Sequence, residues 1–179
     1  MKRIIGYVNT ADLNHMREED VRALTVINIA FGLIRDGEVV WDAKDARDGM
    51  VSIRKSNPEL KIVLSVGGWG ADGFSQAART KEGRERFAAS ALAIVKEYGL
   101  DGIDIDWEFP GMTFSSNAYD ELVDVENFTL LMKDLRAALG QSTLLTYAGY
   151  CMDKRPQGEG YKYIDVKAVD PYVDFVNIM

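Results

Sequence analysis

Four acidic residues fall within one short apolar segment, DGIDIDWEFPG, residues 101–111. Apolar residues at alternate positions indicate a buried β-strand, yet the segment also carries Asp101, Asp104, Asp106 and Glu108. Burying several carboxylates together is costly unless they are paired, protonated or used in chemistry. The segment therefore indicates a site that handles protons.

Alternation along a strand places the apolar and the acidic side chains on opposite faces. Successive acids on one face lie about 6–7 Å apart, so they interact and their pKa values separate. Asp104 should lie deepest and Glu108 outermost. A solvated acidic edge strand is the alternative, but the wholly apolar opposite face favours burial on both sides. The apolar set is Ile103, Ile105 and Trp107, and the acidic set is Asp104, Asp106 and Glu108.

The rest of the chain alternates strand candidates with helical segments. The expected strands are 3–8, 26–32, 61–68, 102–108, 144–150 and 174–179. Helical periodicity is clearest over 81–98, with Thr80 as N-cap, and over 125–139, with Asp124 as N-cap and Gly140 after the last turn. Repeated βα units without a low-complexity linker predict an α/β fold, a parallel sheet covered by helices.

Two parallel architectures compete for this pattern. GWGADG, residues 68–73, matches the G-x-G-x-x-G pattern of doubly wound dinucleotide-binding sheets. However, Trp69 would put a large ring inside the phosphate turn, and no clear acidic residue ends the next strand to hold a ribose. A (β/α)8 TIM barrel explains more, because it sends the acid row toward the C-terminal mouth where barrel active sites lie.

The composition of the chain disfavours several classes of binding partner. The 179 residues carry a net charge of −7, which disfavours nucleic acid and anionic membranes, and no apolar run is long enough to span a bilayer. The only cysteine is Cys151 and the only histidine is His15, so neither a disulfide nor a cysteine- or multi-histidine-built metal site is expected. We expect no cofactor and no metal. The alternative is Mg²⁺ or Ca²⁺ bound by the acids at alternate positions. The oligomeric state stays open.

The acid row resembles the Asp-x-x-Asp-x-Asp-x-Glu signature of glycoside hydrolase family 18, the chitinases and their relatives. LSVGGWG, residues 64–70, resembles the Ser-x-Gly-Gly motif on the third barrel strand of that family. GYVNT, INIAFG and VDFVNIM resemble its first, second and sixth strands. The order and the spacing of the motifs agree with the family over essentially the whole chain.

The resemblance implies hydrolysis of β-1,4-linked N-acetylglucosamine with retention, assisted by the substrate's own acetamido group. Glu108 would be the general acid and base, and Asp106 would orient the acetamido group. Asp104 would share a proton with Asp106 and help keep Glu108 protonated, with Ser65 hydrogen-bonded to Asp104. Asp101 has the other parity, so we expect it to be structural.

Aromatic rings at strand ends should bind the sugars by stacking. Trp69, presented by the glycine turn, is the best candidate. Core packing is the alternative for each of the large side chains. The expected substrate-binding residues are Tyr7, Phe31, Ser65, Gly68, Trp69, Tyr150 and Met179.

The family's sixth strand leads within two residues into a Tyr-Asp pair, whereas this sequence ends at Met179. The resemblance thus implies a catalytic TIM-barrel domain, residues 1–179, truncated at its C-terminus and holding about six of eight βα units. The expected partners are chitin or N-acetylglucosamine oligosaccharides, and this substrate favours a secreted protein. An endo-β-N-acetylglucosaminidase acting on glycoproteins and a non-hydrolytic chitin-binding relative are the alternatives. Phe109 stands where many relatives have tyrosine, which removes a hydroxyl expected on the leaving-sugar side.

Overall fold

A computed structural model describes residues 2–44, 46–113, 115–150 and 163–179, so Cys151 lies outside the described residues. The strands are β1 (Ile5–Asn9), β2 (Val26–Arg35), β3 (Glu38–Val40), β4 (Lys61–Gly67), β5 (Gly102–Asp106), β6 (Leu144–Gly149) and β7 (Phe175–Ile178). The helices are η1 (Thr10–His15), α1 (Glu18–Ala23), α2 (Ala46–Ser56), α3 (Phe74–Ala78), α4 (Lys81–Tyr98), α5 (Asp124–Leu139), α6 (Val166–Val169) and η2 (Asp170–Tyr172). None of the described helices is both long and apolar enough to cross a membrane.

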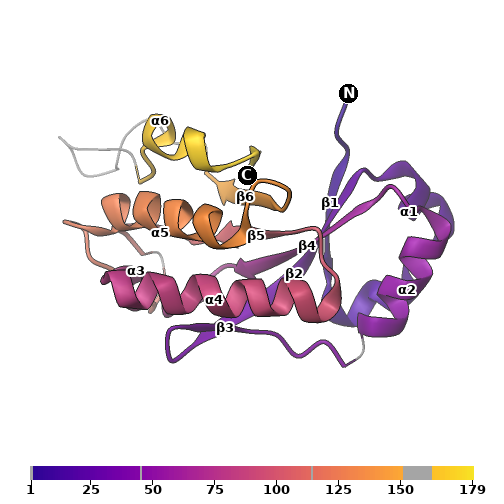
Figure 1. Ribbon diagram of the computed structural model, residues 1–179, viewed down its shortest axis with the longest axis horizontal. Helices are drawn as coiled ribbons and strands as arrows, with labels where there is room; N and C mark the ends of the chain where they lie inside the picture. Colours follow the sequence, from indigo (N-terminus) through magenta and orange to yellow (C-terminus); the bar gives the residue numbers. More distant parts are fainter. Residues whose placement is uncertain (1, 45, 114, 151–162) are drawn as a thin grey trace.

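The strands pair in the order in which they occur along the chain. The sheet runs β1-β2-β4-β5-β6-β7 with every neighbouring pair parallel, while β3 pairs antiparallel with β2 (Figure 1). A doubly wound sheet reverses its order partway, and this sheet does not. The described strands therefore form part of a (β/α)8 barrel, with six of its parallel strands, as the sequence predicted.

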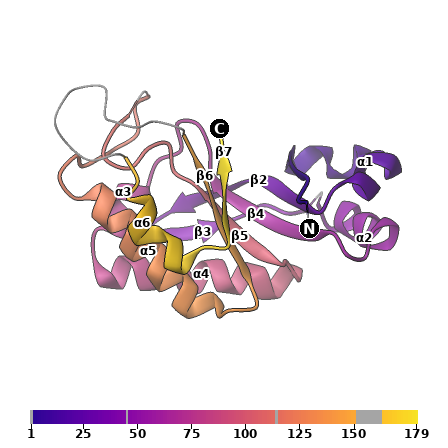
Figure 2. The same cartoon turned by 90° about the horizontal axis from the view of Figure 1, so that it is seen from above.

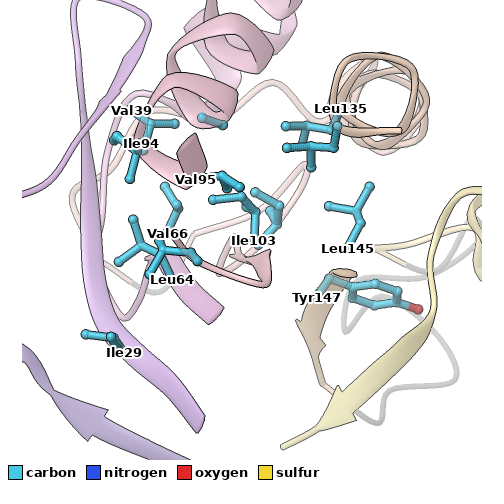
Figure 3. Close-up of a cluster of buried hydrophobic side chains, with 14 of the residues drawn as sticks. Ile29, Val39, Leu64, Val66, Ile94, Val95, Ile103, Leu135, Leu145 and Tyr147 are labelled. Carbon is cyan, nitrogen blue, oxygen red and sulfur yellow. The ribbon is translucent and has the colours of Figure 1, made fainter. Parts of the chain in front are cut away.

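The helices cover one face of this sheet (Figure 2). The main hydrophobic core lies between that face and the helices, where Leu64, Ile103 and Leu145 meet Val95 of α4 and Leu135 of α5 (Figure 3). The opposite, inner face carries polar side chains near the C-terminal ends of the strands. This division follows from strand alternation, because every second residue faces the helices.

Helix ends agree only in part with the sequence. Thr80 is the N-cap of α4, and its side chain accepts a hydrogen bond from the amide of Gly83. Gly140 is the C-cap residue of α5, at φ 76°. The prediction for Asp124 was wrong, because Asp124 is the first residue of α5 and Val123 is its N-cap. The carboxylate of Asp124 is instead used by the loop that precedes the helix.

Two strand boundaries also differ. β5 ends at Asp106, so Glu108 lies in the segment beyond the strand. β2 continues past residue 32 to Arg35 and turns back into β3. Asp36 and Gly37 form the turn, with φ 53° and 79°, which is the geometry of a two-residue hairpin turn. The Asp-Gly pair was the available signal for this hairpin.

Ion pairs involving buried or half-buried side chains hold the N-terminal ends of the strands together. The carboxylate of Asp101 accepts hydrogen bonds from the amide of Ile62 at 2.9 Å and from Arg54 at 2.8 Å. Asp101 is therefore structural, as predicted from its parity. Arg136, which is buried, donates to the carboxylate of Asp174 at 2.7 Å and to backbone carbonyls at both ends of the link between α5 and β6.

Candidate active site

The parity predicted for β5 is confirmed. Ile103, Ile105 and Trp107 are buried in the core beneath the helices, where the ring of Trp107 stacks on Phe74 at a centroid distance of 5.2 Å. Asp104 lies on the inner face, where side chains from four other strands contact its carboxylate. The apolar side chains of the β5 segment therefore face the helices, and its acidic side chains face the other side of the sheet.

Asp104 accepts four hydrogen bonds and is completely buried. Its Oδ2 accepts from the hydroxyls of Tyr7 at 2.8 Å and Ser65 at 2.7 Å. Its Oδ1 accepts from the hydroxyl of Thr146 at 2.6 Å and from the side-chain amide of Asn177 at 3.0 Å. Two donors on each oxygen use the full accepting capacity of an ionised carboxylate.

These contacts set the electrostatics at the base of the site. Burial raises the pKa of Asp104, and the four hydrogen bonds oppose that rise because they favour the charged form. Burial, together with the charge of Asp104, raises the pKa of Tyr7 far above its usual range. Tyr7 therefore keeps its proton and acts as a donor to Asp104.

Asp106 lies one inward-facing position further along the strand and is 4% exposed. Its Oδ1 is buried and has no hydrogen-bond partner among the described residues. Burial, followed by the charges of Glu108 and Asp104, raises the pKa of Asp106 from 3.8 to about 7. Asp106 can thus take up or release a proton near neutral pH, and it offers a free acceptor atom.

Glu108 is the outermost acid and is half-buried. Burial alone raises the pKa of its carboxyl group, so the contribution of neighbouring charges expected from the sequence is not what raises it. The three acids therefore become progressively more accessible toward the end of the row, in the predicted order. A raised pKa suits a carboxyl group that must hold a proton before reaction.

The segment that carries Glu108 is held by packing and by a buried carboxylate. Phe109 is buried against the rings of Tyr150 and Tyr163, at centroid distances of 5.9 and 5.2 Å. Phe109 therefore helps to hold the segment by packing. Asp124 accepts hydrogen bonds from the amides of Gly111 and Asp120, which fixes the loop after Glu108 to the start of α5.

The ends of β4 and β5 approach so closely that β4 must end in glycine. A Cβ on Gly67 would collide with the carbonyl oxygen of Asp106, and the amide of Gly68 donates to that same oxygen at 2.9 Å. A Cβ on Gly68 would lie 2.9 Å from the ring of Phe31. The glycines therefore bring Phe31 and the chain leading to Trp69 against the end of the acid strand.

Five large side chains predicted to bind sugar are exposed near the C-terminal ends of the strands. Their exposed fractions range from 38% for Phe31 to 65% for Trp69, so core packing does not explain any of them. The hydroxyl of Tyr7 reaches the acid row directly. The others lie around the acid row, Phe31 within β2 and the remaining three just beyond the ends of their strands. The five are Tyr7, Phe31, Trp69, Tyr150 and Met179.

Sequence reasoning missed three polar side chains on the inner face. Thr146 and Asn177 complete the contacts of Asp104. Asn28 is 1% exposed, and neither polar atom of its side chain has a hydrogen-bond partner among the described residues. Each is a lone polar residue inside an apolar strand, and that interruption of the pattern was the available signal.

The acid row was also considered as a site for a divalent cation. In the part of the chain that the structure describes, no three histidine, cysteine, aspartate or glutamate side chains are grouped to hold a metal ion. The four donors on Asp104 occupy the lone pairs that a cation would need. These residues therefore do not fit a metal site built on Asp104.

Known proteins match this chain in sequence and in structure. Chitotriosidase-1 of Mus musculus is 36% identical over 137 residues, and chitinase B of Serratia marcescens is 29% identical over 176 residues. These alignments cover 72% and 80% of this chain but 28% and 33% of the two relatives, so the chain spans about a third of their length or less. A family 18 N-acetylglucosaminidase from Paenibacillus barengoltzii superposes with a TM-score of 0.90 at 35% identity, covering 99% of this chain and 53% of that one.

The match to a family is equally extensive. Residues 3–179 match the family described as glycosyl hydrolases family 18. That range includes the acid row, the glycine turn and the six parallel strands of the sheet. The chain belongs to glycosyl hydrolase family 18.

Proposed function

We propose that this chain is the catalytic part of a chitinase-like glycosidase, which hydrolyses β-1,4 linkages between N-acetylglucosamine units with retention at the anomeric carbon. Residues 1–179 would belong to one catalytic barrel domain. Chitin or N-acetylglucosamine oligosaccharides would be its substrates, and such substrates favour action outside the cell.

One observation carries the proposal: between the deepest acid and the accessible one lies a buried acceptor that has no partner among the described residues. The four donors to Asp104 favour its charged form against the effect of burial, and the charge of Asp104 contributes to the raised pKa of Asp106. The free Oδ1 of Asp106 supports a role in accepting a hydrogen bond from the acetamido N–H of a substrate. Glu108, half-buried and with a raised pKa, is the acid that solvent and substrate reach.

In the first step, the acetamido carbonyl oxygen attacks the anomeric carbon of its own sugar. The bond from that carbon to the glycosidic oxygen breaks, and Glu108 gives its proton to the departing oxygen. The sugar becomes a cyclic oxazolinium ion with one positive charge. Asp106, accepting from the acetamido N–H, orients the attacking group and balances this charge.

In the second step, Glu108 is a carboxylate and acts as base. It removes a proton from water as the water oxygen bonds to the anomeric carbon from the side that the leaving group vacated. The oxazolinium ring opens, the acetamido group is restored, and Glu108 is again protonated. Two inversions give net retention. The exposed residues Tyr7, Phe31 and Trp69 would contact the sugar rings flanking the cleaved linkage.

The general acid is tested by Glu108→Gln, which keeps the shape of the side chain but removes its titrating proton. Turnover of chitin oligosaccharides by the intact protein should fall about 10²–10⁴-fold while binding persists, because binding depends mainly on the rings and the acetamido group. Glu126→Gln is the matched control, since Glu126 is exposed on α5. Unchanged turnover in Glu108→Gln would overturn the assignment.

Substrate assistance is tested by comparing an oligosaccharide with its deacetylated twin. The deacetylated chain lacks the internal nucleophile and should not be cleaved. Equal cleavage of the two chains would instead require a carboxylate nucleophile. The same assay with a glycoprotein carrying N-linked sugars separates a chitinase from an endo-β-N-acetylglucosaminidase.

A further inference from the structure

The β2–β3 hairpin forms one wall of a groove beside the candidate active site. The groove has a volume of about 570 Å³, within the range of about 300–1,000 Å³ typical of ligand sites. Its lining includes Phe31, Leu33 and Trp41, together with charged side chains that the proposed reaction does not use. Figure 1 shows the hairpin lying alongside α4. The amide of Val39 donates to the hydroxyl of Ser90 on that helix at 2.8 Å, which anchors the hairpin.

The groove has an apolar surface that is already in place. Leu33, which is 45% exposed, pairs across the hairpin with Val40. The indole N–H of Trp41 donates to the hydroxyl of Thr10 at 3.1 Å, and that hydroxyl donates to the carbonyl of Ala30 at 3.2 Å. The Trp41 ring is therefore connected through Thr10 to the middle of β2. Flat apolar surfaces of this kind suit the faces of pyranose rings.

Phe31, which lines the groove, places it near the acid row. Ala30, the preceding residue, pairs with Ser65, and Ser65 pairs with Asp104. β2 therefore lies two strand spacings from β5, which is about 10 Å. Phe31 also lies against Gly68, the residue after β4, and β4 is the strand that pairs with the acid strand β5. A glycan held by the acids can thus extend into the groove.

The charges of the groove distinguish one class of glycan. Arg35, Lys44 and Asp42 are the charged residues that line it, and all three are exposed. The carboxylate of Asp42 accepts from the backbone amide of Lys44 at 3.3 Å. Glu38 stands across the hairpin from Arg35. Among the described residues, however, no carboxylate lies within ion-pairing distance of Arg35 or Lys44, whereas nine other basic residues form ion pairs.

We propose that this groove binds a saccharide unit that carries a carboxylate and flanks the cleaved linkage. The ring of that unit would pack on Phe31, Leu33 and Trp41, and its carboxylate would bind Arg35 and Lys44. The inference rests on the proposed function, since it adds a preference among N-acetylhexosamine chains. A chain that alternates N-acetylglucosamine with N-acetylmuramic acid has this chemistry.

Binding to the Glu108→Gln form of the intact protein tests the proposal without turnover. The probes are an alternating N-acetylglucosamine and N-acetylmuramic acid tetrasaccharide and neutral tetra-N-acetylglucosamine, measured by calorimetry. The carboxylated probe should bind more tightly, and added salt should reduce its advantage. Replacing both cations, Arg35→Gln with Lys44→Gln, should weaken the carboxylated probe about tenfold and the neutral probe by less than about twofold.

Two further variants separate charge from packing. Lys96→Gln with Lys133→Gln removes two exposed cations, of α4 and α5, that do not line the groove, and it should leave both affinities unchanged. Leu33→Gln should reduce the affinity for both probes, because it removes shared apolar contact. Equal binding of the two probes, equal loss of both in the double cation variant, or no binding of the carboxylated probe would overturn the proposal. Failure of the proposed function is distinguished by a separate assay, because the wild-type protein would then cleave no N-acetylglucosamine chain.

Discussion

Asp106→Asn should make the protein more stable at neutral pH while impairing its proposed chemistry. In the folded protein, burial and two neighbouring carboxyl groups raise the pKa of Asp106 from 3.8 to about 7. The rise is about three pH units, and each unit corresponds to about 1.4 kcal/mol, so ionised Asp106 costs the folded state at most about 4 kcal/mol. Because water reaches the neighbouring Glu108, we expect about 2–4 kcal/mol.

The sign of the pH dependence follows from proton binding. Between about pH 4 and about pH 7, the folded protein keeps the Asp106 proton while the unfolded chain has lost it. Folding is therefore linked to proton uptake in this range, and the wild type loses stability as the pH rises. Asparagine cannot ionise, so the stability advantage of Asp106→Asn should grow through this range and level off above about pH 7.

Urea unfolding followed between about pH 4 and about pH 8 measures this difference as a shift in midpoint. Asp48→Asn on the exposed face of α2 is the matched control, since it removes a carboxylate that is not buried. A difference that stays constant with pH, or a wild type more stable than Asp106→Asn above about pH 7, would refute the claim that burial of Asp106 destabilises the fold.

Two further variants test contacts in different parts of the sheet, one at the base of the candidate site and one at the N-terminal ends of the strands. Thr146→Val removes one donor to buried Asp104 and should cost about 1.5–3 kcal/mol in unfolding free energy, whereas Thr129→Val, on α5, should cost less than about 0.5 kcal/mol; similar losses would contradict the importance of the Asp104 contact. Arg136→Met removes the donors to three backbone carbonyls and the cation beside the exposed carboxylate of Asp174, and it should cost about 1.5–3 kcal/mol, with the pH profile of any activity unchanged. A shifted pH profile in Arg136→Met would mean that the N-terminal ends of the strands affect the titration of the acid row.

The sequence predicted which side chains of the β5 segment face inward, because strand parity is a local property. It placed Ile103 and Asp104 on opposite faces and made Asp101 structural, and the structure confirms all three. Parity needs only the strand itself. The βα alternation likewise predicted a parallel sheet, and the sequential strand order follows from connections that return each strand beside its predecessor.

The sequence did not predict which side chains meet across strands. Asn177 lies 73 residues from Asp104 along the chain, so their contact depends on strand order and on register, neither of which is local. The hairpin after β2 was missed because β3 has only three residues and so shows no alternation, although Asp36-Gly37 marks its turn. Asp124 was assigned to a helix cap, and its use by the loop before the helix depends on how that loop folds back.

The four donors to Asp104 also bear on the order in which the sheet assembles. Tyr7 and Ser65 precede Asp104 along the chain, whereas Thr146 and Asn177 follow it. Each strand pairs with a strand already made, so the sheet can grow from β1 as the chain leaves the ribosome.

A sheet grown only as far as β5 would hold Asp104 with half of its donors, and its Oδ1 would still require water. Burying that oxygen without a partner is unfavourable, and adding β6 and then β7 relieves the cost. The Asp104 carboxylate therefore favours the addition of β6 and then β7 to the growing sheet, because these two strands supply its remaining hydrogen bonds.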